Sequence, residues 1–230
     1  MITSITLFNF HNYTGEEGKL VKYYPVFWDI RNKKCVVVGG GDVAARKIKR
    51  LLDCGANIFV VSPQLTSELV TLKAENLIVH IAGNYEAHYL EGAVLVIGAT
   101  DDEKTNAAVA QDARSMGISV NIVDDPQKCD FILPAVVQRG DFSLAIGTGG
   151  KSPALARLLR EELEDKYGTE YEVLLNILGS LRQAMKKSGT GKAWFDSLLA
   201  CGILDLIRAR NWDKVKNKVK EITGEEVDIE

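Results

Sequence analysis

The fold of this chain is decided by residues 36–44, which read Val36-Val37-Val38-Gly39-Gly40-Gly41-Asp42-Val43-Ala44. A β-branched run predicts a buried strand, and G-x-G-x-x-A follows it at the start of a predicted helix. We expect Gly39 to make the tight turn, Gly41 to let a pyrophosphate approach the backbone, and Ala44 to let helix and strand pack closely. The helix N-terminus would bind the phosphates. The segment therefore predicts a dinucleotide site, and the alternative is a glycine-rich turn without a ligand.

The surrounding sequence alternates short apolar runs with amphipathic segments, which is typical of a parallel sheet covered by helices. The predicted strands are residues 35–38, 58–61, 77–81, 94–99, 119–122 and 143–146. Residues 43–52 and 105–116 have the spacing of surface helices, and Gly117 is expected to end the second one. We therefore predict an α/β fold with a Rossmann-type parallel sheet.

The pattern changes after Pro134. A hairpin-like stretch through residues 138–141 is followed by a helix, for which Ser152 is the expected N-cap and Pro153 the first residue. Residues 171–230 predict several helices, separated by a loop at 188–191 and by Gly224. We divide the chain into an N-terminal extension (1–22), a Rossmann domain (23–133), a small α+β region (134–170) and a C-terminal helical domain (171–230).

Further cofactor contacts are expected where two strands end. The second strand ends in Ser62-Pro63-Gln64, without the acidic residue that usually binds the adenosine ribose. Ser62 or Gln64 could bond the ribose instead, and the absence of a nearby arginine mildly favours NAD over NADP. Thr100 follows the fourth strand and is expected to contact the cofactor. The predicted cofactor-binding residues are Gly39, Gly41, Asp42, Val43, Ser62, Pro63, Gln64 and Thr100.

Composition excludes several classes of protein. The net charge is −3 without a long block of one sign, which argues against nucleic-acid binding. No apolar run approaches the roughly 20 residues of a membrane helix, and the first twenty residues do not resemble a secretory signal. The four cysteines are far apart, so we expect reduced thiols in a soluble, cytoplasmic protein. Without clustered ligands we expect no resident metal site, and we expect no catalytic role for the three histidines.

One apparent nucleotide motif fails on spacing. The residues Gly149-Gly150-Lys151-Ser152 precede a predicted helix, as in a phosphate-binding P-loop. That motif needs a glycine five residues before Gly150, where this chain has Ala145. We therefore do not expect an NTPase.

Six motifs in order resemble the precorrin-2 dehydrogenases, which occur free-standing or as the N-terminal module of siroheme synthase. They are Tyr24-Pro25-Val26-Phe27, Val38-Gly39-Gly40-Gly41-Asp42-Val43-Ala44 with Arg46-Lys47, Ala99-Thr100-Asp101-Asp102, Asn121-Ile122-Val123-Asp124, Asp130-Phe131-Ile132-Leu133-Pro134-Ala135, and Gly149-Gly150-Lys151-Ser152-Pro153-Ala154-Leu155-Ala156-Arg157. The resemblance covers most of the chain, although residues 1–22 lie outside it.

The resemblance implies NAD-dependent oxidation of precorrin-2 to sirohydrochlorin. It also implies a homodimer whose middle region, residues 134–170 here, exchanges elements between subunits. Some members insert ferrous iron to give siroheme, and the sequence leaves open whether this chain does. The family's important aspartate falls on Asp124, and its serine or threonine beside paired glycines falls on Thr148, so these are the expected catalytic residues. For Asp124, an alternative is that it only shapes a turn with Asp125 and Pro126.

A tetrapyrrole rich in carboxylates needs a basic lining, although each candidate cation could instead lie on a solvated surface. The candidates are Arg46, Lys47, Lys128, Arg139, Lys151 and Arg157. Two rival functions also fit a dinucleotide site. One is a non-catalytic dinucleotide-sensing regulator that uses its helical tail for interactions. The second is a dehydrogenase of a different small acid, for which the sequence offers no convincing catalytic set.

Overall fold

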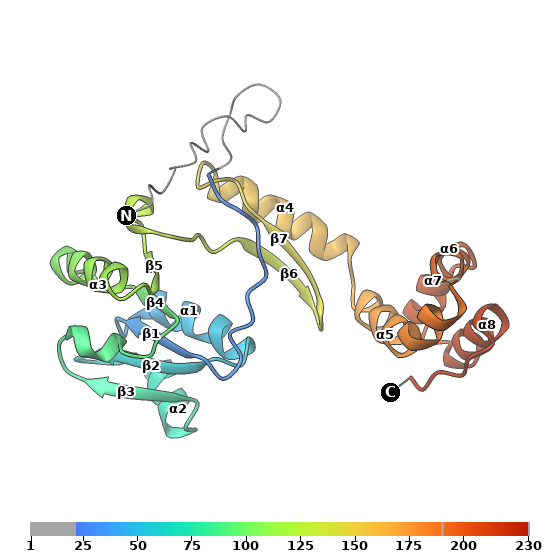
Figure 1. The fold of residues 1–230 in the computed structure, drawn as a ribbon, viewed down its shortest axis with the longest axis horizontal. Helices are drawn as coiled ribbons and strands as arrows, with labels where there is room; N and C mark the ends of the chain where they lie inside the picture. The colour runs from blue at the N-terminus through green and yellow to red at the C-terminus, as the bar shows by residue number, and fades with distance from the viewer. Residues whose placement is uncertain (1–21, 190, 230) are drawn as a thin grey trace, which may run out of the picture. The chain divides into compact units, whose positions relative to one another are not determined.

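The computed structural model describes residues 22–189 and 191–229. The described residues divide into two compact units, the first ending at Ile132 and the second beginning at Leu133. Figure 1 shows strands and helices alternating in the first unit and a hairpin followed by helices in the second. In the described part of the chain, no helix is long and apolar enough to cross a membrane.

The first unit contains a five-stranded parallel sheet in the order β3-β2-β1-β4-β5. Its strands are β1 (Lys34–Val38), β2 (Asn57–Ser62), β3 (Ile78–Ala82), β4 (Leu95–Gly98) and β5 (Ser119–Ile122). All five were predicted, and the predicted ends agree with the structure to within one residue. The sheet is of the Rossmann type that the glycine motif indicates.

Helices cover both faces of this sheet. They are α1 (Asp42–Asp53), α2 (Ser67–Ala74), η1 (Ala87–Leu90), α3 (Glu103–Ser115) and η2 (Pro126–Lys128). The sequence analysis did not identify α2, because Leu69 is its one buried residue and it has no apolar stripe. As predicted, α3 ends before Gly117, whose φ of +69° suits glycine.

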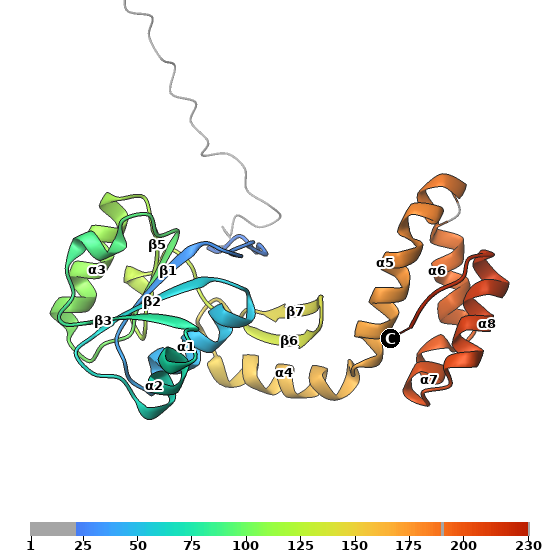
Figure 2. The same ribbon diagram turned by 90° about the horizontal axis from the view of Figure 1, so that it is seen from below.

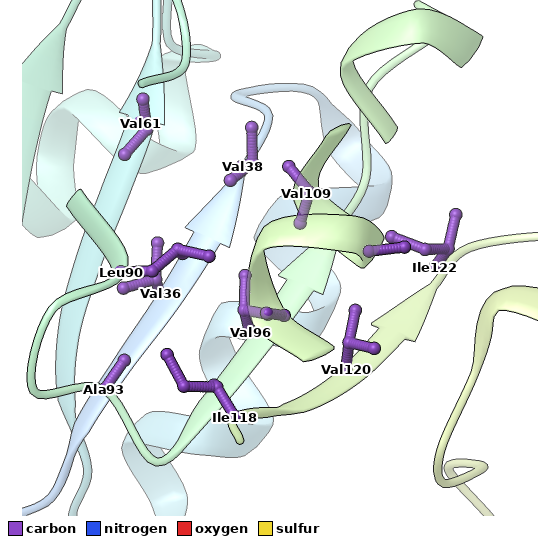
Figure 3. Packing of buried hydrophobic residues seen from close by; sticks show 12 residues of the cluster. Val36, Val38, Val61, Leu90, Ala93, Val96, Val109, Ile118, Val120 and Ile122 are labelled. Atoms are coloured by element: carbon purple, nitrogen blue, oxygen red, sulfur yellow. The ribbon is translucent and has the colours of Figure 1, made fainter. Parts of the chain in front are cut away.

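The core follows from the alternation of side chains along each strand. Val36 and Val38 of β1 point to the face that α3 covers, where they pack with Val96 and Val109 (Figure 3). Val37 points to the opposite face, which α1 contacts. Because both faces are covered, β1 and β4 at the middle of the sheet are almost wholly apolar and buried.

The second unit begins with an antiparallel hairpin of β6 (Ala135–Arg139) and β7 (Phe142–Ile146). The hairpin was predicted, but only β7 was expected as a strand. The helix α4 (Pro153–Lys166) contacts the hairpin. The Ser152 hydroxyl accepts a hydrogen bond from the amide of Leu155 at 3.2 Å, so the predicted N-cap is confirmed.

Four further helices form a separate apolar core in this unit (Figure 2). They are α5 (Glu170–Ser188), α6 (Gly191–Ala200), α7 (Ile203–Arg208) and α8 (Trp212–Thr223). Gly189 and Gly224 end α5 and α8 with φ of +68° and +74°, as the predicted breaks require. Leu198 and Ile203 are fully buried at the centre of this core.

An ion pair joins α5 to α7. The side chain of Glu170 is 8% exposed, and its Oε1 accepts from Nε and Nη2 of Arg208 at 2.9 and 2.7 Å. Burial raises the pKa of Glu170, but the hydrogen bonds from its own backbone amide and from Arg208 outweigh burial and lower the pKa overall. The charged form therefore stabilises the folded state.

We expect Glu170→Gln to lower the free energy of unfolding at pH 7. The lowered pKa means that this stabilisation is present above about pH 4.3, the usual glutamate value, and is lost as the pH falls through the folded-state value. Denaturant unfolding of both proteins from pH 7 to pH 3 measures the difference. Glu161→Gln is the control, because Glu161 pairs with Arg157 on an exposed helix surface. A difference that does not change with pH would contradict the assignment.

Candidate functional site

The candidate site lies at the carboxyl ends of β1, β4 and β5. These strands end in one row, since Val38 pairs with Gly98 and Gly98 pairs with Ile122. From β1 the chain continues to β2, and from β4 it continues to β5 on the opposite side. Open α/β sheets bind ligands at such a switch point. The segments that follow the three strands therefore define the site.

Gly39 makes the turn out of β1. Its φ is +129°, a conformation that other residues rarely adopt, and its amide donates to the Val61 carbonyl at 2.9 Å. A Cβ at this position would lie 2.2 Å from the carbonyl oxygen of Ala99. Both the conformation and the close approach therefore require glycine, as the motif predicts.

Gly40 is equally constrained, although the motif leaves this position open. A Cβ here would lie 2.0 Å from the carbonyl oxygen of Gln64 and 2.6 Å from Oγ of Ser62. The amide of Thr66 donates to the Gly40 carbonyl at 3.0 Å. The loop after β2 thus packs directly on the glycine turn. Sequence reasoning missed this constraint, and its one signal was a glycine at the position that the motif leaves open.

Gly41 lies in open space. Its φ is −86°, and a Cβ here would meet no described heavy atom within 4 Å beyond its chain neighbours. It is the N-cap of α1, which has no capping side chain, whereas Asp102 caps α3 by accepting from two amides. The first amides of α1, including those of Asp42 and Val43, therefore have no side-chain acceptor. Open space beside an uncapped helix N-terminus fits the pyrophosphate of a dinucleotide.

The end of β2 is held by a cluster of hydrogen bonds. The hydroxyl of Ser62 is buried and donates to the Gln64 carbonyl at 2.7 Å. From β3, Nε2 of His80 donates to the Ser62 carbonyl at 2.9 Å. The Ser62 proton is thus used within the protein, whereas Pro63 and Gln64 are exposed. Of the two predicted ribose contacts, the Gln64 side chain is therefore the freer donor.

Asp124 follows β5 at the same edge of the sheet. Its φ of +61° is left-handed, which aspartate tolerates better than most residues. The neighbouring Asp125 accepts from the Gln127 amide and pairs with Lys128 at 2.5 Å, and the Lys128 hydrogen bond lowers the pKa of Asp125. Asp125 thus caps the short helix η2, and Asp124 lies in the turn before it. Both the turn-shaping alternative and the catalytic role of Asp124 stay predictions.

The helix α1 places a cation near Asp124. Lys47 is half-buried, and burial together with Arg50 and Arg46 lowers the pKa of its ammonium group. The Asp124 carboxylate acts in the opposite direction and raises that pKa. Lys47 and Asp124 therefore interact electrostatically at the sheet edge.

Thr148 lies in the second unit, in the turn before α4. Its hydroxyl donates to the Ser152 carbonyl at 3.1 Å and accepts from the Ser152 amide at 3.3 Å. Gly149 and Gly150 continue the turn with φ of +61° and +80°. The structure thus shows a turn-forming role for Thr148, and its catalytic role stays a prediction.

The candidate basic residues other than Lys47 divide into two groups. Lys128 pairs with Asp125, Arg157 pairs with Glu161, and Arg139 donates to the carbonyls of Gln138 and Glu164. Arg46 and Lys151 are exposed and have no ion-pair partner among the described residues. No group of three or more His, Cys, Asp or Glu side chains in the described ranges could hold a metal ion.

Two family models match the chain. Residues 26–135 match a model described as putative NAD(P)-binding. Residues 139–166 match a model described as sirohaem biosynthesis protein central. The first match contains the glycine turn, Thr100 and Asp124, and the second contains Thr148 and the whole of α4.

Curated relatives and a solved structure agree with these matches. The siroheme synthase of Nitrosomonas eutropha is 38% identical over 211 residues, which cover 90% of this chain and 44% of that protein. The siroheme synthase of Methylobacillus flagellatus is 42% identical over 163 residues, covering 71% and 35%. This chain thus spans less than half the length of these relatives. A structure titled SirC, precorrin-2 dehydrogenase, matches with a TM-score of 0.69 and 25% identity, over 88% of this chain and 100% of that chain.

We expect Gly41→Ala to fold normally but to bind NAD about tenfold more weakly, because the added methyl enters space that the pyrophosphate would occupy. Gly40→Ala should instead lower the thermal unfolding midpoint by about 5 °C or more, because its methyl meets the Gln64 carbonyl. Circular dichroism on heating measures stability, and titration calorimetry measures NAD affinity. Equal NAD affinity of Gly41→Ala and the unmodified protein would argue for a glycine turn without a ligand.

Proposed function

This chain belongs to the family of precorrin-2 dehydrogenases and siroheme synthases, and on that premise we propose that it oxidises precorrin-2 to sirohydrochlorin with NAD. The proposal depends most on one observation: the glycine turn and Asp124 lie at the same edge of the sheet. The glycine turn, with open space at Gly41, follows β1, and Asp124 follows β5, whose end lies in the same row as the end of β1. A dinucleotide and a proton acceptor are the two things that a dehydrogenation needs.

The residues after β2 support NAD over NADP. Residues 62–66 contain no arginine or lysine that could bind a 2′-phosphate. The exposed Gln64 side chain can bond the ribose, while Ser62 and His80 hold the backbone that carries it. When bound, NAD supplies the acceptor for a hydride from a ring carbon of the substrate.

Asp124 is proposed as the base of the reaction. The oxidation removes two hydrogens from the macrocycle. One leaves a ring carbon as a hydride, for which NAD would be the acceptor, and the other leaves as a proton, which a carboxylate at the sheet edge can accept. Lys47 of α1 interacts electrostatically with that carboxylate, which raises the pKa of the Lys47 ammonium group. Thr148 is proposed as a second catalytic residue on the family resemblance, with Gly149 and Gly150 leaving backbone exposed beside it.

Two further groups are proposed for the substrate. The exposed Arg46 and Lys151 suit its carboxylates, because neither is paired within the described chain. Ferrous iron is proposed as a second substrate, inserted into sirohydrochlorin to give siroheme, since the curated relatives are siroheme synthases. Four free thiols suit the cytoplasm as the place of this reaction.

A homodimer is proposed from the surface of α4. Ala156 is buried on the side of α4 that faces its own unit, whereas Leu155 and Leu158 are 46% and 52% exposed. Leucines on a second face of a helix indicate that another surface covers it. A second copy is the occupant that the family resemblance implies for this region.

The activity is tested by anaerobic incubation of the full chain with NAD and precorrin-2 generated in the cuvette. We expect sirohydrochlorin and NADH in the optical spectrum, and a second spectral change when ferrous or cobaltous ion is added. Asp124→Asn should reduce turnover by about 100-fold or more while NAD still binds, because asparagine keeps the left-handed conformation and loses the base.

Three outcomes would change the proposal. NAD binding without turnover in the unmodified protein would favour a dinucleotide sensor. Unchanged turnover in Asp124→Asn would remove the base from Asp124. An absent metal-dependent change would limit the chain to dehydrogenation.

We expect the double variant Leu155→Asp with Leu158→Asp to shift the chain from dimer to monomer, because it charges the exposed apolar face of α4. Light scattering coupled to gel filtration measures the mass. Arg157→Gln is the control, since Arg157 lies on the same helix and is paired with Glu161. A monomer before substitution, or a dimer after it, would contradict the assignment of this face.

A further inference from the structure

We infer that Asn106 is a positioning residue for the nicotinamide half of the cofactor, because it fixes the loop of residues 99–102 at the edge of the sheet. This inference rests on the proposed NAD binding. Asn106 lies in α3 and is only 9% exposed, which is unusual for a polar side chain. A buried amide is retained where its hydrogen bonds are made within the protein.

Asn106 bonds Thr100 at three atoms. Its Nδ2 donates to the Thr100 carbonyl at 2.9 Å. Its Oδ1 accepts from the Thr100 hydroxyl at 3.2 Å and lies 3.4 Å from the Thr100 amide, which also donates to it. The amide side chain therefore accepts from the two donors of Thr100 and donates to its carbonyl. An apolar side chain of the same size could not make these hydrogen bonds.

The same loop is tied to α3 by a second set of bonds. The Thr100 hydroxyl accepts from the amide of Asp102 at 3.1 Å, and it lies 3.1 Å from the Asp102 carbonyl. The Asp102 side chain caps α3 at the amides of Lys104 and Thr105. The Thr100 hydroxyl is thus satisfied inside the loop. A contact between Thr100 and the cofactor would use its backbone or its methyl group.

The loop is also fixed against the strand ends. Oδ1 of Asn106 would lie 3.1 Å from a Cβ added at Gly98, the last residue of β4. The Ala99 carbonyl packs on the glycine turn, where a Cβ at Gly39 would lie 2.2 Å from it. Asn106 therefore sets where the loop stands relative to the turn that would hold the pyrophosphate.

The position of the loop in the sheet assigns it to one half of the cofactor. The adenosine ribose of a dinucleotide lies at the end of β2, on one side of β1. The loop of residues 99–102 follows β4, on the other side of β1. Displacing this loop should therefore weaken binding of the nicotinamide half and leave the adenosine half unaffected.

The test compares NAD with ADP, which lacks the nicotinamide half. Asn106→Asp keeps the shape of the side chain but replaces the donor to the Thr100 carbonyl by an acceptor. We expect its dissociation constant for NAD to rise by about tenfold and that for ADP to change by less than about twofold, measured by titration calorimetry. Val109→Ala is the matched control, because Val109 is buried in the same helix and its truncation lowers stability without contacting the loop.

A second pair of variants changes Thr100, the partner of Asn106 in these hydrogen bonds. Thr100→Val removes the hydroxyl and should weaken NAD binding selectively, and Thr100→Ser, which restores the hydroxyl, should recover most of that loss. This pair tests the inference even where Asn106→Asp does not fold.

The outcomes separate this inference from the proposed function. An unmodified protein that binds neither NAD nor ADP would overturn both. Normal NAD binding by Asn106→Asp and Thr100→Val would overturn the inference alone. An equal loss for NAD and ADP, matched by Val109→Ala, would show a merely structural Asn106 and would also overturn it.

Discussion

Close backbone packing at the glycine turn is the constraint on which the rest of the site depends. The loop after β4 places the Ala99 carbonyl where a side chain at Gly39 would be. The loop after β2 places the Gln64 carbonyl where a side chain at Gly40 would be. Two loops from opposite sides of β1 are thus held against one turn. Their positions relative to the N-terminus of α1 follow from this contact.

This packing also explains why several polar side chains near the site bond to the protein. A loop pressed against a glycine turn has buried backbone groups, and these groups need partners. The hydroxyl of Ser62 bonds the Gln64 carbonyl, and Asn106 bonds the carbonyl of Thr100. These side chains hold the surfaces that a cofactor would contact. We therefore expect a cofactor to be recognised by backbone amides, by the exposed Gln64 side chain and in the open space at Gly41.

Two aspartates follow β5 at the edge of the site, and their contacts differ. Asp124 and Asp125 are adjacent in the sequence, yet the structure separates their roles. Asp125 pairs with Lys128 and accepts from the Gln127 amide, so it caps the short helix η2. Asp124 has Lys47 of α1 as its electrostatic neighbour. We therefore propose Asp124, and not the paired Asp125, as the proton acceptor at this edge.

The sequence by itself determined the five parallel strands and the glycine turn, because apolar periodicity and glycine spacing are local signals. It also identified Ser152 as an N-cap and the hairpin around Gly140. It missed α2, whose short sequence has no apolar stripe, and the strand β6, which precedes that hairpin.

Only the tertiary structure decided which polar residues bond the protein and which remain available to ligands. The constraint on Gly40, the bonds of Asn106 and the proximity of Lys47 to Asp124 all join residues from different strands or helices. Such contacts depend on how the strand ends and loops pack at the edge of the sheet. The spacing of residues along the chain does not predict these contacts, because they join segments that are distant in sequence.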